Sequence, residues 1–152
     1  MPPWLGNELQ VTAEKQEQLP PVPALDARLL AAAAYVRRGA LVADIGCDHG
    51  KLAVYLARTG AARRVVAADI RPAPLARARA LVEKHRCGAA VECRLGDGLH
   101  VLSPDEADDI VIAGVSGVTA AEMLAAAPQF WRAGKRFIFV PATKRAELRG
   151  WL

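Results

Sequence analysis

Long apolar runs and paired cysteines are both scarce in this sequence of 152 residues. No apolar run reaches the roughly 18–20 residues that span a bilayer, so a membrane-spanning helix is not expected. Residues 1–25 lack the basic start and apolar centre of a signal peptide. The three cysteines, Cys47, Cys87 and Cys93, are odd in number and lack metal-site spacing, which favours reduced thiols over disulfides or a zinc site. These absences predict a cytoplasmic protein with no membrane segment and no metal.

Aromatic residues make up only 5% of the chain, yet hydrophobic residues make up 53%, many of them alanine. A chain of this length and apolar content can bury its own core, which excludes disorder for most of it. The net charge is +4; three glutamates and one lysine give residues 1–24 a charge of −2, so the remainder carries +6. An Arg-rich surface attracts phosphate, although an arginine-biased genome would explain the same charge equally well.

Residues 1–24 contain five prolines and no periodicity, which predicts an irregular N-terminal tail. Residues 25–152 are predicted to fold, with strands and helices in alternation. The strands are expected at 41–47, 65–70, 91–96, 109–113 and 136–140. Helices are expected to begin at residues 25 and 72, and three more are expected at 51–59, 118–127 and 144–152. Gly39 is expected to be the left-handed cap of the first helix. Near-continuous apolar strands separated by helices specify an α/β fold with a parallel sheet covered on both faces.

The first strand leads into the sequence Asp44-Ile45-Gly46-Cys47-Asp48-His49-Gly50. Ligands of doubly wound sheets bind beyond the C-terminal strand ends, and Gly46 and Gly50 permit a tight turn there. A dinucleotide site uses G-x-G-x-x-G to hold a pyrophosphate, but here Asp48 stands where the second glycine would be. A carboxylate repels pyrophosphate and attracts a sulfonium or ammonium group. The loop therefore favours S-adenosyl-L-methionine over NAD as the cofactor.

Two further acids stand at the ends of the next two strands. Asp69 lies 25 residues after Asp44, where its carboxylate can accept hydrogen bonds from both ribose hydroxyls. Asp97 follows the third strand, where it can accept a hydrogen bond from an adenine amino group. Each acid has the alternative of capping a helix or a loop, and this alternative is stronger for Asp97 than for Asp69.

The remaining charged positions give weaker signals. His85 and His100 are predicted to be ordinary surface or boundary residues. The Arg37-Arg38 and Arg63-Arg64 pairs are predicted to be solvated, unless they share a face with the cofactor site.

At these positions the sequence resembles the bacterial tRNA (adenine-22-N1)-methyltransferases, a family of class I S-adenosyl-L-methionine-dependent enzymes. The resemblance covers residues 25–152 and rests on Leu25-Asp26-Ala27-Arg28-Leu29, Val42 to His49 with its Asp48-His49 pair, Arg94-Leu95 through Gly98-Leu99, Ile112-Ala113-Gly114, and Leu148 to Leu152. It implies a Rossmann-like core with strand order 3-2-1-4-5. It also implies methyl transfer from S-adenosyl-L-methionine to N1 of an adenine in the tRNA D-arm.

Together, the motif and the resemblance assign candidate roles to individual residues. Asp48 is a candidate catalytic residue, because its charge can stabilise a methylated base, or it binds the methionine amino group. His49 is a second catalytic candidate, with bracing of the loop as its alternative. The candidate cofactor-binding residues are Asp44, Gly46, Cys47, Asp48, Gly50, Asp69, Ile70, Asp97, Gly98 and Gly114, and the candidate substrate-binding residues are Arg28, Ser116 and Pro141.

The sequence departs from the family in three ways. Where the family has the motif G-M-G-G, this chain has Gly114-Val115-Ser116-Gly117, and where the family has P-N-N, it has Pro141-Ala142-Thr143. The chain is also expected to lack terminal strands six and seven and a C-terminal region that grips tRNA. The strand at 136–140 should then form an apolar edge, covered by the N-terminal tail, by a second copy in a homodimer or by a separate C-terminal chain. A non-catalytic cofactor- or RNA-binding remnant and a small-molecule methyltransferase are the alternative functions.

Overall fold

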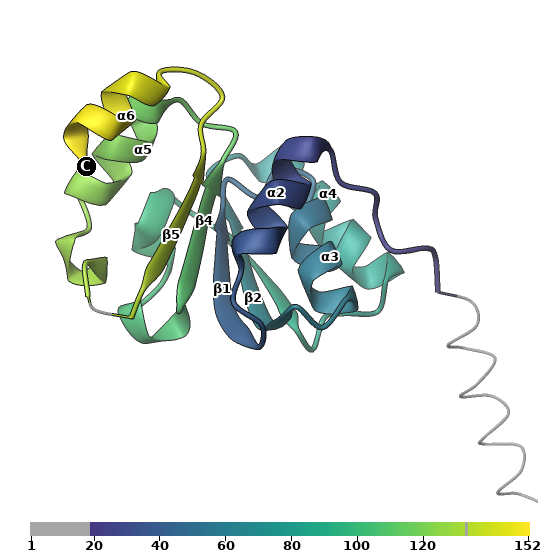
Figure 1. Cartoon of the computed structure of the whole chain (residues 1–152). Helices are drawn as coiled ribbons and strands as arrows, with labels where there is room; N and C mark the ends of the chain where they lie inside the picture. The colour runs from purple at the N-terminus through teal and green to yellow at the C-terminus, as the bar shows by residue number, and fades with distance from the viewer. Residues whose placement is uncertain (1–18, 133) are drawn as a thin grey trace, which may run out of the picture.

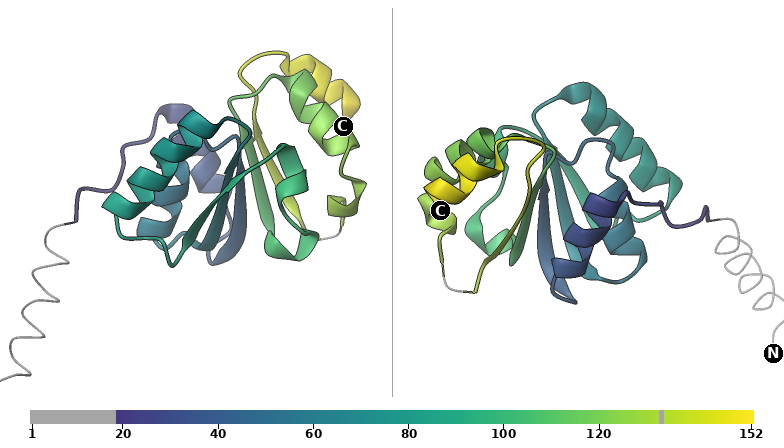
Figure 2. Two further views of the ribbon diagram at one scale, coloured as in Figure 1. Left: turned by 180° about the vertical axis from the view of Figure 1, so that it is seen from behind. Right: turned by 45° about the horizontal axis from the view of Figure 1, so that its top comes forward.

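The computed structural model describes residues 19–132 and 134–152, so most of the predicted tail lies outside the described residues. Five parallel strands form one sheet in the order β3-β2-β1-β4-β5, with helices on both faces (Figures 1 and 2). The strands are β1 (Ala40–Ile45), β2 (Ala62–Asp69), β3 (Val91–Leu95), β4 (Asp109–Ala113) and β5 (Arg136–Val140). The helices are α2 (Ala27–Tyr35), α3 (Lys51–Arg58), α4 (Pro72–Lys84), α5 (Gly117–Ala125) and α6 (Arg145–Trp151), with short 3-10 helices η1 (Gly98–Val101), η2 (Pro104–Glu106) and η3 (Pro128–Phe130). The predicted fold class and strand order are confirmed.

Two apolar cores lie on opposite faces of the sheet. Helices α2, α3 and α4 cover one face, and α5 and α6 cover the other (Figure 1). Alternate residues of β1 serve the two cores: Val42 packs with the first group of helices, whereas Ala43 and Ile45 pack with the second. A strand that is buried on both faces needs apolar residues at nearly every position, which is why the strands read as continuous apolar runs.

Some predicted boundaries hold, whereas others, such as the start of β2 at Ala62 and the end of β1 at Ile45, differ from the prediction. The fourth and fifth strands have the predicted bounds, and Pro72 occupies the first turn of α4. The first helix, however, ends at Tyr35, so Gly39 is not its cap. Gly39 does adopt a positive φ of 77°, but in the turn before β1, where its N–H donates to the Ala61 carbonyl at 2.9 Å. The three 3-10 helices were not predicted, because single turns carry no periodicity.

An ion pair between half-exposed Arg37 and buried Asp109 lies directly after α2. The Arg37 backbone N–H donates to Oδ2 of Asp109 at 2.7 Å, and its Nε donates to Oδ1 of the same residue at 2.7 Å. The guanidinium also donates to the Asp108 and Gly134 carbonyls. Because Asp109 is fully buried, its charge requires these donors. The prediction that Arg37 is merely solvated was therefore wrong.

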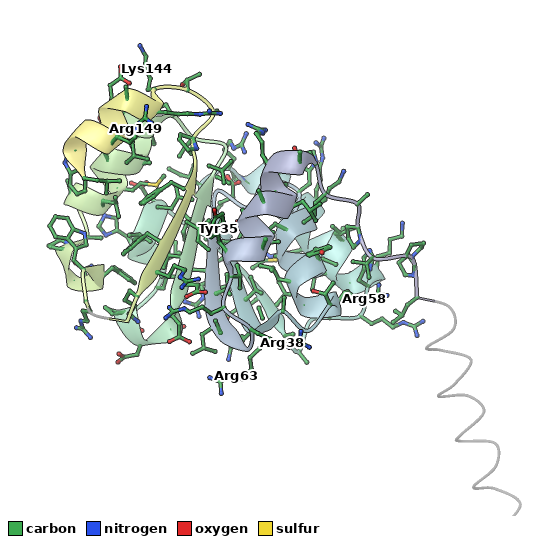
Figure 3. The ribbon with its side chains drawn as sticks, in the orientation of Figure 1. Tyr35, Arg38, Arg58, Arg63, Lys144 and Arg149 are labelled. Atoms are coloured by element: carbon green, nitrogen blue, oxygen red, sulfur yellow. The ribbon has the colours of Figure 1, made fainter. Side chains whose placement is uncertain are left out.

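Two of the predicted surface arginines lie away from the C-terminal strand ends, whereas His100 is exposed on η1, shortly after β3. Arg38 and Arg63 are exposed next to the N-terminal ends of β1 and β2, at the opposite end of the sheet from Lys144 on the loop after β5 (Figure 3). His85 is buried rather than at the surface, because Nη1 of Arg58 approaches its Nδ1 at 2.6 Å beneath the end of α4. Burial and the adjacent Arg58 lower the pKa of His85.

None of the helices in the described ranges has the length and apolarity to cross a bilayer. The same residues contain no cluster of three or more potential metal ligands.

Candidate functional site

Two adjoining cavities open at the C-terminal ends of the strands. One has a volume of about 260 Å³ and lies towards α2 and α3; the other, of about 360 Å³, lies towards η1 and α5. Gly46, Asp48, Ala113 and Gly114 line both, so the two cavities form one groove that crosses the ends of β1 and β4. This is the switch point of the strand order, because β1 has β2 on one side and β4 on the other.

The loop between β1 and α3 forms the floor of this groove. The N–H groups of Gly46 and Cys47 both donate to the Ala68 carbonyl at 2.9 Å, which ties the loop to β2. Gly50 has a φ of 79°, and a Cβ there would lie 2.9 Å from the Cβ of Ala78. Gly50 lines neither cavity, and its small size instead lets α3 begin directly against α4.

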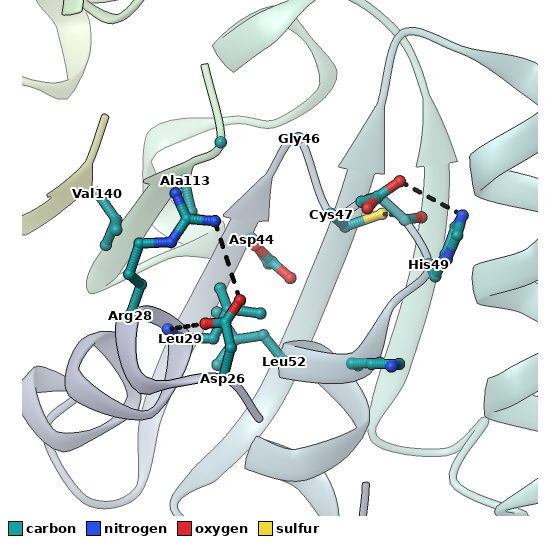
Figure 4. Close-up of a pocket in the computed structure, with 13 residues that line it drawn as sticks. Asp26, Arg28, Leu29, Asp44, Gly46, Cys47, His49, Leu52, Ala113 and Val140 are labelled. Atoms are coloured by element: carbon teal, nitrogen blue, oxygen red, sulfur yellow. Dashed lines mark hydrogen bonds and ion pairs between the residues drawn. The ribbon is translucent and has the colours of Figure 1, made fainter. Parts of the chain in front are cut away.

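Asp44 is a buried acid with an unpartnered oxygen. Its side chain comes from the end of β1 into the smaller cavity, where no dashed line joins it to the surrounding residues (Figure 4). Among the described residues, its Oδ2 is the buried side-chain oxygen without a hydrogen-bond partner. Burial, together with the charges of Asp69 and Asp48, raises its pKa to about 7. Such a carboxyl group provides a site for a cation or a hydrogen-bond donor.

Asp69 differs from Asp44 because its oxygens are fully engaged. The N–H groups of Asp48 and Arg71 donate to its two oxygens at 3.0 and 2.9 Å, and the Arg71 guanidinium donates to both at 3.4 and 3.2 Å. Burial opposes ionisation, but these hydrogen bonds outweigh it and lower the pKa of Asp69. Asp69 therefore places a fixed negative charge at the side of the larger cavity.

The far end of the larger cavity combines polar and apolar groups. Ile70, Asp97, Gly98 and Met123 line it. Asp97 precedes η1 but makes no side-chain capping hydrogen bond to it, so the capping alternative is not what the structure has. An exposed carboxylate beside apolar Ile70 and Met123 suits a flat heterocycle that carries an amino group.

Asp48 stands at the junction of the cavities, His49 lines the smaller one, and both are exposed. Nη1 of Arg77 lies 3.0 Å from Nε2 of His49, and because arginine can only donate, Nε2 is the acceptor in that contact. The same Nε2 lies 3.6 Å from Oδ1 of Asp48. Cys47 is buried, and burial raises its thiol pKa, which makes it a packing residue rather than a nucleophile.

The three candidate substrate residues have different positions. Arg28 lines the smaller cavity and lies 3.9 Å from the Asp26 carboxylate (Figure 4). Ser116 lies outside both cavities and caps α5 by accepting from the Thr119 N–H at 3.1 Å. Pro141 also lies outside, although the preceding Val140 lines the smaller cavity.

The loops after β4 and β5 are held together through their backbones. The Gly117 N–H donates to the Thr143 carbonyl at 2.7 Å, and the Ala142 N–H donates to the Val115 carbonyl at 2.9 Å. A Cβ on Gly117 would overlap the carbonyl oxygen of Lys144. Gly117 is thus required for the approach of these loops beside the groove.

Several lining residues were not predicted from the sequence. They are Asp26, Leu29, Lys51, Leu52 and Val140 in the smaller cavity, Ile45, Ala68, Arg71, Gly96, Val115 and Met123 in the larger one, and Ala113 in both. Arg71 had a detectable signal, because it follows Asp69 by two residues. Met123 had none, since only the docking of α5 brings it to the groove.

Comparison with known proteins agrees with this geometry. Residues 25–152 match the family model described as a methyltransferase domain. The chain is 36% identical over 128 residues to the tRNA (adenine(22)-N(1))-methyltransferase of Bacillus subtilis, covering 84% of this chain and 54% of that protein. The crystal structure of the B. subtilis m1A22 tRNA methyltransferase TrmK superposes with a TM-score of 0.81, covering 85% of this chain and 55% of that one.

A second solved structure is that of M. capricolum TrmK in complex with the natural cofactor product S-adenosyl-homocysteine. It is 28% identical, with a TM-score of 0.72, and the match covers 84% of this chain and 56% of that one. The chain thus spans little more than half the length of these relatives. The sequence resemblance is confirmed at the level of the domain, and the chain belongs to the methyltransferase domain family.

Proposed function

We propose that residues 25–152 are the S-adenosyl-L-methionine-binding domain of a tRNA adenine-N1 methyltransferase. The observation that carries this proposal is the unpartnered, buried Asp44 oxygen in the same groove as Asp69. The relatives that cover this domain are tRNA (adenine(22)-N(1))-methyltransferases, and one was crystallised with S-adenosyl-homocysteine. With a tRNA substrate, we also propose a cytoplasmic location.

The residues of the groove fit the chemical groups of the proposed cofactor. Asp44, buried and without a donor at Oδ2, fits the ammonium of the methionine part. Asp69 offers carboxylate oxygens to the ribose hydroxyls. Asp97 would accept a hydrogen bond from the adenine amino group, and Ile70 and Met123 would supply apolar contacts for the ring. When bound, this cofactor supplies a methyl group activated by an adjacent sulfonium.

In this proposal the chain's own residues align the reacting base and stabilise its charge. N1 of adenine has a free lone pair, so the site needs alignment more than it needs a base. Asp48 lines both cavities at their junction, and its carboxylate stabilises the positive charge that the methylated adenine acquires. His49, exposed beside Asp48, lines the smaller cavity on the side from which the base would arrive.

A cofactor-binding chain without catalysis is the second candidate. It is favoured by the loops after β4 and β5, which are held by backbone hydrogen bonds and present Ala142 and Thr143 where the family has amide side chains. These amides would otherwise be available to position a base. The two candidates share the cofactor site and differ only in methyl transfer.

Calorimetry and a transfer assay test both candidates. S-adenosyl-homocysteine should bind the wild type, Asp97→Ala should bind it more weakly, and Asp105→Ala, on the exposed η2 turn, should match the wild type. Tritiated methyl transfer to an unmodified tRNA transcript, compared with a transcript carrying guanine at position 22, then measures activity. Tritium incorporation into the transcript with adenine at position 22, but not into the one with guanine, supports the methyltransferase. Binding without transfer supports the second candidate, and absence of binding refutes both.

We further propose that a second copy of the chain pairs along β5. In the part of the chain that the structure describes, β5 is a sheet edge. The Arg136 N–H donates to the Asp108 carbonyl, and the Val140 carbonyl accepts from the Gly114 N–H, so the backbone of these residues faces β4. Because successive residues of a strand face opposite sides, the N–H and C=O groups of Phe137 and Phe139 face away from β4. Beside this edge lies an apolar hollow of about 350 Å³, lined by Leu124, Trp131, Phe137, Phe139, Trp151 and Leu152. A self-complementary edge of this kind favours a two-fold dimer; a separate chain is the alternative partner.

A further inference from the structure

Arg71 lies across the carboxylate that the proposed cofactor would use. It follows β2 and precedes the first residue of α4. Its Nε lies 3.2 Å from Oδ1 of Asp69, and its Nη2 lies 3.4 Å from Oδ2 of Asp69 and 3.6 Å from Oδ1 of Asp48. The Arg71 side chain is 61% exposed, whereas that of Asp69 is 2% exposed. The guanidinium therefore forms an exposed outer wall of the larger cavity over a buried acid.

Helix capping does not explain an arginine at this position. Arg71 is the N-cap residue of α4, and its side chain makes no capping hydrogen bond. A cation at a helix N-terminus is electrostatically unfavourable, because the helix dipole is positive there. The contacts that its side chain does make are with Asp69 and Asp48, both of which line the groove.

Counting acceptor sites shows that Arg71 and a ribose exclude each other. An ionised carboxylate offers about four lone-pair sites. On Asp69, the backbone N–H groups of Asp48 and Arg71 occupy two, and these donors are fixed by the loop and by the start of α4. The Arg71 guanidinium occupies the other two. A ribose with two vicinal hydroxyls needs those same two sites, so the guanidinium has to leave when the ribose binds.

A displaced guanidinium remains at the mouth of the groove. Arginine cannot lose its charge, and the exposed side chain can turn outwards without unpacking any core residue. It then lies beside Asp48 at the junction of the cavities, where the methyl acceptor must enter. Its planar donors suit a phosphate group, which they can bind with two hydrogen bonds.

We propose that Arg71 couples the two ligands of this site: it competes with the cofactor ribose for Asp69 and, once displaced, binds a phosphate of the incoming RNA. The inference rests on the proposed function and adds to it a coupling between its two ligands. Bound cofactor raises the affinity for RNA. By thermodynamic linkage, RNA raises the affinity for cofactor by the same factor.

The first experiment measures the competition by calorimetry, without RNA. Arg71→Ala should bind S-adenosyl-homocysteine roughly two- to fivefold more tightly than the wild type, because an exposed ion pair of this strength no longer has to be broken. Arg71→Lys should lie between the two. Dideoxyadenosine, which lacks both ribose hydroxyls, should bind the wild type and Arg71→Ala alike. The matched control is Arg79→Ala, an exposed arginine on α4 that does not line the groove.

The second experiment measures the coupling with an unmodified tRNA transcript. Saturating S-adenosyl-homocysteine should strengthen RNA binding by the wild type and by Arg79→Ala, but not by Arg71→Ala. With S-adenosyl-homocysteine bound, the salt dependence of Arg71→Ala should fall by about one phosphate contact, a change of about 0.7 to 0.9 in the logarithmic slope. Melting temperatures of all variants check that they are folded.

The outcomes separate this inference from the proposed function. If S-adenosyl-homocysteine binds the wild type but Arg71→Ala binds it equally or more weakly, the competition is overturned. If it strengthens RNA binding equally in the wild type and Arg71→Ala, the phosphate role is overturned. If it does not bind the wild type at all, the proposed function fails and this inference fails with it.

Discussion

Asp44 should decrease the stability of the free protein while serving the bound ligand, and Asp44→Asn tests this directly. The carboxyl group is 2% exposed and its Oδ2 has no partner, so the folded chain strongly disfavours its charge. Its pKa is raised from 3.8 to about 7, first by burial and then by the charges of Asp69 and Asp48. The folded state therefore holds a proton that the unfolded state has already released. Stability is highest below the unfolded pKa and is lost as the pH rises towards 7.

The size of the effect follows from linkage. Between pH 5 and pH 8, the unequal protonation of Asp44 should lower the free energy of unfolding of the wild type by roughly 2–3 kcal/mol. Asparagine does not titrate, so the variant should lack this loss. Its own unsatisfied amide adds a cost of about 1–3 kcal/mol that does not depend on pH. The stability of Asp44→Asn relative to the wild type should therefore rise by roughly 2–3 kcal/mol from pH 5 to pH 8.

Urea unfolding of both proteins at pH 5, 6, 7 and 8 gives this difference, with Asp105→Asn as an exposed control. Calorimetry on the same samples should show weaker binding of S-adenosyl-L-methionine to Asp44→Asn, because the neutral amide cannot compensate an ammonium charge. A relative stability that does not change between pH 5 and pH 8 would refute the reasoning about the buried charge. Unchanged affinity would remove Asp44 from the methionine end of the site.

Two further predictions concern the loops and the sheet edge. Gly117→Ala should lower the free energy of unfolding by about 3 kcal/mol or more, since the added methyl overlaps a backbone carbonyl. The control is Gly150→Ala, which has open space around it and should be neutral or slightly stabilising in the same denaturant titrations. Equal effects of the two substitutions would contradict the packing argument. Light scattering at micromolar concentration should show self-association through β5, with slow amide exchange at Phe137 and Phe139. A monomer in which these two amides exchange rapidly would exclude the dimer.

The sequence by itself determined the architecture of this domain and the core of its groove. Continuous apolar strands alternating with helices imply a sheet buried on both faces, and the carboxyl ends of such strands meet at one edge. Asp44, Asp48 and Asp69 could therefore be assigned to one groove before any coordinates, and Asp97 could be placed beyond the next strand. These inferences succeed because they depend only on local pattern and on the direction of parallel strands.

Only the tertiary structure decided which neighbours those acids have. Asp44 and Asp69 lie near the C-terminal ends of neighbouring strands, yet one lacks a partner at Oδ2 and the other has four donors, from Asp48 and Arg71. Arg37 looked solvated until the fold placed the buried Asp109 beside it, 72 residues away in sequence. Burial and pairing are set by residues far apart in the chain, so no local pattern carries them.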